Sequence, residues 1–171
     1  EYPDGPRRLA DGGTWSTLAG QPTDDSELAL MLARSLVRAA RFDPKSVLRA
    51  YAHWYESGPF DMGATTRCAL SAASAALRAG EADPFLQVSR AANAGSQANG
   101  ALMRVSPLGV FGHAADPAVL AAWAREDAGL THPHPVCRDA SAVHAIAIAR
   151  AVASGQDPRE LHRFAVQWAR A

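Results

Sequence analysis

Two neighbouring carboxylates stand where a helix is expected to begin. Asp24 and Asp25 lie between Thr23 and Ser26, so hydroxyl and carboxylate oxygens are concentrated in one short stretch. Such hard oxygen donors are the ligands that Mg²⁺ and Mn²⁺ prefer. The same stretch also suits a helix N-terminus, because Asp24 stands three residues before Glu27, as in a capping box. Spacing alone favours capping over metal binding.

A second candidate segment combines small and amide residues. It reads Gly95, Ser96, Gln97, Ala98, Asn99 and Gly100, and it leads into an apolar stretch. Backbone N–H groups in such a loop can surround a phosphate group, with help from the Ser and Asn side chains. Asn-Gly and Gly-Ser pairs are also typical of ordinary turns, and the pattern alone favours a turn.

Two histidines are separated by a proline near residue 133. Because His132 and His134 occupy alternate positions of an extended, proline-stiffened loop, their side chains are expected to point to opposite sides. This arrangement argues against a metal ion shared by the two imidazoles. One histidine that donates to a ligand and an ordinary surface histidine are equally compatible with the pattern.

Three further side chains could take part in chemistry. Asp61 lies in a loop just before an expected helix and suits either a general base or an exposed helix cap. Arg67 and Arg104 could each bind a phosphate or an aspartate, and structural ion pairs are the commoner outcome. No serine nucleophile elbow, Walker loop or catalytic Cys–His pair appears in the sequence.

Apolar residues recur at helical spacing along nearly the whole chain, and no segment alternates as a strand would. The sequence therefore predicts an all-α domain of about six to eight helices. These helices are expected at 25–41, 44–57, 65–79, 84–92, 117–129, 138–154 and from residue 158 onwards. The irregular segments between them are expected at 11–27, 58–66, 93–113 and 130–137, and they hold all of the candidates above except Arg67, which falls in the helix expected at 65–79.

The charge balance excludes several classes of partner. The chain of 171 residues has 17 basic and 17 acidic side chains, whereas a nucleic-acid or anionic-membrane binder needs a basic surplus. No apolar run approaches the roughly 20 residues that span a bilayer. We therefore expect neither a nucleic-acid partner nor a membrane segment. Cys68 and Cys137 are expected to be reduced, buried thiols of a cytoplasmic protein.

Taken together in chain order, four segments resemble motifs of the ADP-ribosylglycohydrolase family, of which the dinitrogenase-reductase-activating glycohydrolases are one type. The segments are Gly-Gln-Pro-Thr-Asp-Asp-Ser (20–26), Asp-Met-Gly-Ala-Thr-Thr-Arg (61–67), Asn-Gly-Ala-Leu-Met-Arg-Val-Ser-Pro-Leu-Gly (99–109) and Leu-Thr-His-Pro-His (130–134). The resemblance covers nearly the whole chain, and the combination is specific although each motif alone is common.

The resemblance implies a compact orthogonal bundle of helices with a binuclear Mg²⁺ centre, or one that binds Mn²⁺, in a central cleft. It also implies hydrolysis of the glycosidic bond between ADP-ribose and an acceptor such as an arginine side chain. The expected partner is therefore an ADP-ribosylated protein or a small ADP-ribose conjugate. A catalytically inactive helical module that binds ADP-ribose, or is only structural, is the alternative.

The resemblance also assigns roles by position. Thr23, Asp24 and Asp25 match the family's first metal-ligand motif, and Asp61 matches an acidic residue implicated as the general base. The remaining matches are Gly95, Ser96, Gln97 and Asn99 in the loop that holds the diphosphate, and His132 near the ribose.

The chain departs from the family pattern at both ends. It begins just after the point where a Gly-Asp-Ala-Leu-Gly motif is usual, and it lacks the later Asp-x-Asp-Thr or Asp-x-Asp-Ser motif. We therefore expect residues 1–171 to be one domain that holds the central part of a longer fold. Without the bridging metal ligands, the isolated chain is expected to be inactive or nearly so. Ser26 stands where Thr is usual, and Ala98 where Gly is usual.

Overall fold

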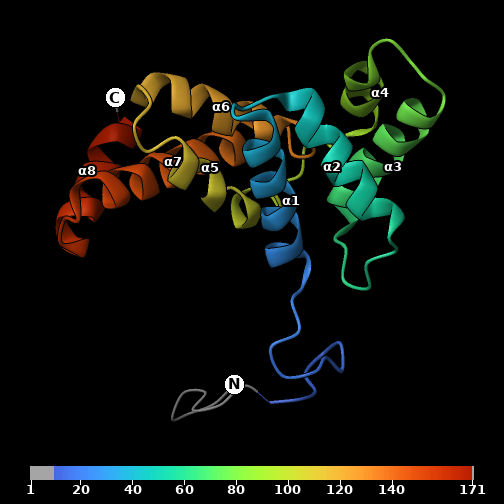
Figure 1. Cartoon of the computed structure of the whole chain (residues 1–171), viewed down its shortest axis with the longest axis horizontal. Helices are drawn as coiled ribbons and strands as arrows, with labels where there is room; N and C mark the ends of the chain where they lie inside the picture. The colour runs from blue at the N-terminus through green and yellow to red at the C-terminus, as the bar shows by residue number, and fades with distance from the viewer. Residues whose placement is uncertain (1–9, 171) are drawn as a thin grey trace.

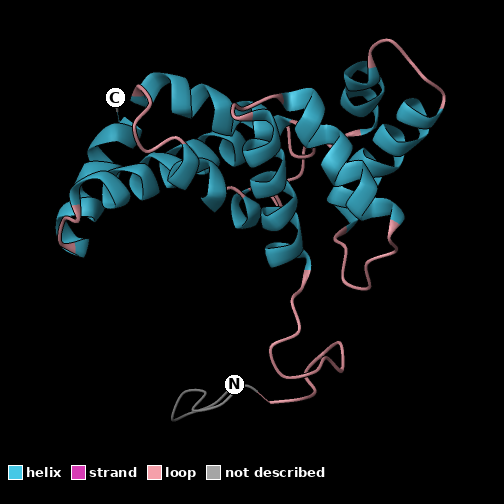
Figure 2. Cartoon of the chain, in the orientation of Figure 1, coloured by secondary structure: helices cyan, strands magenta, loops and turns pink. Residues whose placement is uncertain are grey.

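The computed structural model describes residues 10–170, and this part of the chain is built from helices joined by loops (Figures 1 and 2). The helices are α1 (Asp24–Ala39), α2 (Pro44–Glu56), α3 (Ala64–Arg78), α4 (Pro84–Ala91), the 3₁₀ helix η1 (Leu102–Arg104), α5 (Ser106–Phe111), α6 (Pro117–Gly129), α7 (Pro135–Ser154) and α8 (Pro158–Arg170). Outside them, residues 10–170 contain a single isolated β-bridge, between Gly12 and Thr17. The predicted all-α fold is confirmed. Residues 1–22, rich in Gly, Pro and Asp, are also predicted to be irregular, and residues 1–9 of this segment lie outside the described residues.

Aspartate–proline pairs set the starts of several helices. The side chains of Asp43, Asp83 and Asp116 accept hydrogen bonds from backbone N–H groups in the first turns of α2, α4 and α6. In each case a proline follows, whose fixed φ suits the first turn of a helix. These caps explain why the predicted starts of the three helices agree with the structure.

Helices α1 and α2 form an antiparallel hairpin at the centre of the molecule. Side-chain hydrogen bonds join them at two levels, from Ser35 to Ser46 at 2.8 Å and from Trp54 Nε1 to Glu27 at 2.6 Å. In Figure 1, α3 and α4 lie on one side of this hairpin, and α6, α7 and α8 lie on the other. The loops at the ends of these helices therefore bring together parts of the chain that are distant in sequence.

The core is formed by one apolar face of each central helix. It includes Leu28, Leu32 and Leu36 of α1, which are at most 1% exposed. Small residues bring α5 and α7 into close contact, because a Cβ atom at Gly109 would lie 2.7 Å from the carbonyl oxygen of Ala145. No helix in residues 10–170 is long and apolar enough to cross a membrane.

Three expectations from the sequence are wrong. Residues 93–113 are predicted to be irregular throughout, yet η1 and α5 occupy much of the second half of this segment. The helical pattern of α5 is hard to recognise because Gly109, which permits close packing on α7, interrupts its apolar residues. Helix α7 begins at Pro135 rather than near residue 138, because His134 caps it by accepting a hydrogen bond from the Val136 N–H. Cys68 is exposed on the outer face of α3, whereas Cys137 is buried as expected.

Candidate active site

The N-terminus of α1 is capped by a side chain from a distant loop. Asp61, which lies between α2 and α3, accepts a hydrogen bond from the Asp24 N–H at 2.9 Å through its Oδ2 atom. The local N-cap residue, Thr23, makes no capping bond, and Glu27 accepts instead from Trp54. The capping-box interpretation of Asp24 and Glu27 is therefore wrong, and Asp61 is brought next to the carboxylates of α1.

We refer to Asp24, Asp25 and Asp61 as the acidic cluster. Partial burial, followed by the charges of Asp61 and Asp25, raises the pKa of Asp24 from 3.8 to about 6. The Oδ1 atom of Asp61 is buried and has no hydrogen-bond partner in the described part of the chain. Thr23 adds a hydroxyl oxygen, which is 3.4 Å from the Asp25 carboxylate. The acidic cluster is thus an oxygen-rich group that forms no ion pair with a basic side chain of residues 10–170.

The acidic cluster does not amount to a complete metal cage. Within residues 10–170 there is no group of three or more His, Cys, Asp or Glu side chains placed to hold a metal ion. The buried, unpartnered Oδ1 atom of Asp61 and the repulsion that raises the pKa of Asp24 nevertheless fit a cation, since a buried polar atom needs a partner. The residues present suit a partly hydrated divalent ion held by a few carboxylates.

The loop at 93–100 lies against the N-terminal ends of α3 and α7. The hydroxyl groups of Ser96 and Thr65 are 2.8 Å apart, which joins the loop to α3. Cys137 of α7 donates its thiol proton to the carbonyl oxygens of Ser96 and Ala98, at 3.5 and 3.4 Å. Helix N-termini carry partial positive charge, so two helices favour an anion near this loop.

Gly100 allows this loop to rest on a buried histidine. A Cβ atom at Gly100 would lie 2.7 Å from Cε1 and 2.9 Å from Nε2 of His132, and 3.0 Å from Oγ1 of Thr66. Only a residue without a side chain fits at such distances. His132 is 1% exposed. Burial, and then the charge of Arg104, lowers its pKa from 6.5 to about 4, so the imidazole is neutral at neutral pH.

Beneath His132 lies an ion pair that is fully buried. The Nε atom of Arg104 donates to the Asp127 carboxylate at 3.2 Å, and both side chains are 0% exposed. Tyr51 donates its hydroxyl proton to the other carboxylate oxygen at 2.8 Å, and its ring centroid is 4.3 Å from the Arg104 guanidinium. Arg104 also donates to the carbonyl oxygen of Asp127 and to the hydroxyl group of Thr131, each at 2.8 Å. Burial alone would lower the pKa of Arg104, but Asp127 and Tyr51 together raise it.

Comparison with known proteins identifies the family. The model of the ADP-ribosylglycohydrolase family matches residues 1–171. This chain belongs to the ADP-ribosylglycohydrolase family. It resembles the ADP-ribosyl-[dinitrogen reductase] glycohydrolase of Rhodospirillum rubrum, with 35% identity over 136 residues, which is 77% of this chain and 42% of the relative.

Other ADP-ribosylglycohydrolases give the same result. An ADP-ribosylarginine hydrolase (Tri1) of Pseudomonas putida (strain GB-1) is 31% identical over 115 residues, which cover 60% of this chain and 28% of that protein. A solved structure described as an ADP-ribosylglycohydrolase-related protein complex superposes with a TM-score of 0.70 at 31% identity, over 92% of this chain and 50% of the other. The chain thus spans half or less of the length of these relatives.

The structure brings together some of the residues matched to the family's motifs. Asp24 is bonded to Asp61, and Thr65 follows Asp61 into α3 and reaches Ser96. The side-chain amide of Gln97 lies 3.4 Å from His134 Nε2. Gly95 and Asn99 are exposed in the same loop. The roles assigned to these residues by the resemblance stay predictions.

Sequence reasoning missed three features of the candidate site. It did not identify Thr65 as the link between two motifs, although Thr65 lies in the segment that begins with Asp61. It also missed the contact of Gly100 with His132. For Arg104 it favoured an ion pair over a phosphate contact, which is confirmed, but it did not name Asp127. No local pattern reveals a contact between residues so far apart in sequence.

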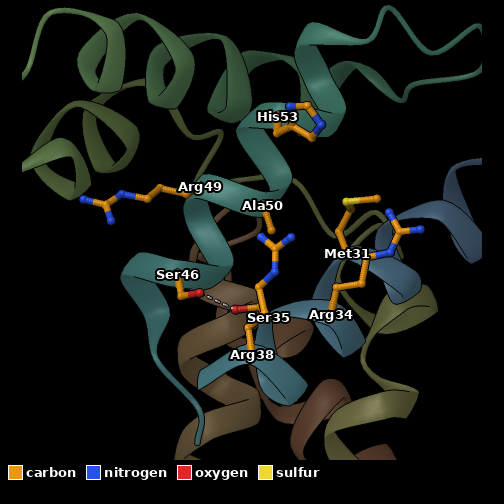
Figure 3. Close-up of a pocket in the computed structure, with 8 residues that line it drawn as sticks. All are labelled: Met31, Arg34, Ser35, Arg38, Ser46, Arg49, Ala50 and His53. Carbon is orange, nitrogen blue, oxygen red and sulfur yellow. Dashed lines mark hydrogen bonds between the residues drawn. The ribbon is translucent and has the colours of Figure 1, made fainter. Parts of the chain in front are cut away.

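A separate basic groove lies between α1 and α2 (Figure 3). Its volume is about 420 Å³, and its lining residues are Met31, Arg34, Ser35, Arg38, Ser46, Arg49, Ala50 and His53. The Ser35–Ser46 hydrogen bond crosses it. None of the residues matched to the family's motifs lines this groove, so it is distinct from the acidic cluster.

Proposed function

We propose that this chain is part of an ADP-ribosylglycohydrolase that hydrolyses the glycosidic bond linking ADP-ribose to a protein side chain. The observation that carries the proposal is the convergence of two unlike surfaces. The acidic cluster and the loop at 93–100 are joined through residues 61–65, because Asp61 binds α1 and Thr65 binds Ser96. An anomeric carbon and a diphosphate of one ligand need such neighbouring sites.

The acidic cluster would hold Mg²⁺, or Mn²⁺ in its place, through Thr23, Asp24 and Asp25. Support comes from the raised pKa of Asp24 and from the oxygen-rich donor set, which suits hard cations. When bound, the metal supplies a positive charge that polarises a coordinated oxygen and lowers the pKa of bound water.

Asp61 suits the role of general base. Its Oδ2 atom is fixed by the Asp24 N–H, and its Oδ1 atom has no partner in the described residues. A carboxylate held at one oxygen can accept a proton at the other once an attacking water reaches that buried atom. The fixed oxygen keeps the free one in a constant position next to the acidic cluster.

The loop at 93–100 would bind the diphosphate of ADP-ribose. The residues proposed to contact it are Gly95, Ser96, Gln97 and Asn99, and His132 would contact the adjacent ribose. The N-terminal ends of α3 and α7 beside the loop favour the negative charge. This remote binding energy would hold the anomeric carbon over the acidic cluster.

The acceptor is proposed to be an arginine side chain of an ADP-ribosylated protein. Two relatives support this class, since one is described as acting on dinitrogen reductase and another as an ADP-ribosylarginine hydrolase. Both cysteines are free thiols, which suits a cytoplasmic protein. The alternative, an inactive ADP-ribose-binding or structural module, is favoured by the incomplete metal cage.

Calorimetric titration with ADP-ribose, with and without Mg²⁺, tests the proposal. We expect binding that Mg²⁺ strengthens and that Asp24→Asn combined with Asp25→Asn abolishes. The matched control is Asp139→Asn, because Asp139 lies in an exposed ion pair with Arg125. Absence of binding would contradict the proposal and favour the structural module. Release of ADP-ribose from an ADP-ribosylated arginine peptide, assayed in parallel, separates an active chain from one that only binds.

A further inference from the structure

A chain of hydrogen bonds joins the buried ion pair to His132. Arg104 donates through NH1 to the Thr131 hydroxyl oxygen at 2.8 Å. The same oxygen lies 2.8 Å from Nδ1 of His132. Arg104, Thr131 and His132 are all buried. Because solvent is excluded, these three residues determine which atom donates and which accepts in each of the two hydrogen bonds.

The direction of each hydrogen bond follows from the donors available. A guanidinium group can only donate, so Thr131 must accept from Arg104. In the described part of the chain, the Thr131 hydroxyl proton has one acceptor within reach, which is Nδ1 of His132. If Nδ1 carried a proton and donated it to Thr131, the hydroxyl proton would be buried without an acceptor, which is unfavourable. Nδ1 is therefore the acceptor.

A neutral imidazole that accepts at Nδ1 carries its proton at Nε2. The Nε2 atom of His132 makes no hydrogen bond within residues 10–170, and it faces the loop at 93–100 beneath Gly100. Arg104 also reaches this loop, because NH1 is 3.5 Å from the Gly100 carbonyl oxygen. The Arg104 guanidinium thus contacts both Thr131, which bonds to His132, and Gly100, which packs on the imidazole ring.

We propose that Arg104 and Thr131 are positioning residues that hold His132 as the Nε2–H tautomer and so present a fixed donor to an oxygen atom of the bound ligand. The identity of that ligand, ADP-ribose, rests on the proposed function. Its phosphate and ribose oxygens are acceptors that match the donor. The low pKa of His132 keeps the imidazole neutral at neutral pH, and the hydrogen bond with Thr131 then selects one of its two neutral tautomers.

Nitrogen-15 NMR of the histidine rings in the whole chain tests the tautomer directly. The His132 signals are assigned by their loss in His132→Gln, and the spectrum is recorded at pH 7.5. We expect a protonated Nε2 and an unprotonated Nδ1. A protonated Nδ1, or an even mixture of tautomers, would overturn the proposal. The tautomer itself is measured on the wild-type protein without ligand, and His132→Gln serves only to assign the signals.

Two variants at one position separate tautomer control from simple packing. Thr131→Val keeps the shape of the side chain and removes the hydroxyl group, so His132 should lose its preference for the Nε2–H tautomer. Thr131→Ser keeps the hydroxyl group and should retain the wild-type spectrum. An unchanged tautomer in a folded Thr131→Val protein would show that Thr131 does not set it.

ADP-ribose then tests the donor role. We expect it to shift the His132 Nε2–H signal, and to bind about tenfold more weakly to Thr131→Val than to Thr131→Ser, the effect of about one hydrogen bond. Binding seen by calorimetry with no change at Nε2 would overturn the donor role while leaving the proposed function intact. No binding at all would overturn the proposed function and the donor role together, whereas the tautomer result would still stand.

Discussion

Two carboxylates, the buried Asp127 and the partly buried Asp61, differ in how completely they are paired. Both oxygens of Asp127 accept hydrogen bonds, one from Tyr51 and one from Arg104, and the arginine neutralises the charge. Asp61 accepts at one oxygen from the Asp24 N–H, and its other oxygen has no partner in the described residues. The charge of Asp61 adds to partial burial in raising the pKa of Asp24, as does the charge of Asp25.

The difference separates a carboxylate that is fully paired within the protein from one that leaves an oxygen unpaired in the described residues, as the proposed cation site requires. A buried charge is stable when it is paired and hydrogen-bonded, as around Asp127. Within residues 10–170, one oxygen of Asp61 has no donor and the neighbouring carboxylates raise the pKa of Asp24, so a bound cation would offset their repulsion. The Arg104–Asp127 ion pair would therefore hold His132 in position, as proposed above. The acidic cluster is the group suited to chemistry.

The largest expected loss of stability follows from breaking the buried Arg104–Asp127 ion pair. Asp127→Ala leaves the Arg104 guanidinium buried without its counter-charge and should destabilise the protein by about 3–5 kcal/mol. Chemical denaturation monitored by circular dichroism measures this free energy. The control is Asp139→Ala, which removes an exposed ion pair with Arg125 and should cost less than about 1 kcal/mol. Similar losses in the two variants would contradict the distinction.

A smaller loss of stability is expected when the loop at 93–100 is pushed away from His132. Gly100→Ala places a Cβ atom 2.7 Å from the imidazole, so the loop or the ring must move, at about 1–3 kcal/mol. Gly95→Ala is the matched control, because its Cβ atom would meet nothing closer than the Asn93 side chain at 3.5 Å. The same denaturation curves test both variants, and equal stability would show that the loop does not rest on the histidine.

The smallest expected change concerns the dependence of stability on pH. The pKa of Asp24 is raised from 3.8 to about 6, so its contribution to folding is present below pH 3.8 and is lost as the pH rises through 6. Asp24→Asn cannot ionise, so the variant should not lose this stability as the pH rises. Because Asp24 is partly exposed, we expect a gain of about 1 kcal/mol, or about 2–4 °C in Tm, at pH 7 in metal-free buffer.

The two proteins should have the same Tm near pH 3.5, where Asp24 is protonated in both the folded and the unfolded wild type. Thermal unfolding at pH 3.5, 5 and 7 provides this comparison. A Tm difference that does not grow with pH would contradict the repulsion within the acidic cluster.

Local sequence patterns predict most of the fold and some of the site. Helix starts at Asp43 and Asp116 follow from the Asp-Pro pairs, and the small residues at 95–100 mark a loop that does lie at two helix N-termini. The short α5 was missed because Gly109, which permits close packing on α7, interrupts its apolar pattern. The tertiary packing of α5 on α7 thus requires a glycine that weakens the local helical pattern of α5.

The features that distinguish the two carboxylate clusters depend on tertiary contacts. Asp61 caps a helix that begins 37 residues earlier, and Arg104 is paired with an aspartate 23 residues later. Spacing along the chain carries no record of either contact. The sequence therefore could not show that Asp127 is fully paired, or that one oxygen of Asp61 has no partner in the described residues.

Titration of metal-free protein with Mn²⁺, followed by electron paramagnetic resonance, tests the central claim most directly. The account predicts one saturable site, with a Kd on the order of millimolar for an incomplete cage. The Asp24→Asn, Asp25→Asn double variant should lose it, and Asp139→Asn should bind as the wild type does. Equal binding by all three proteins, or no saturable binding by the wild type, would contradict the claim that the acidic cluster is built for a cation.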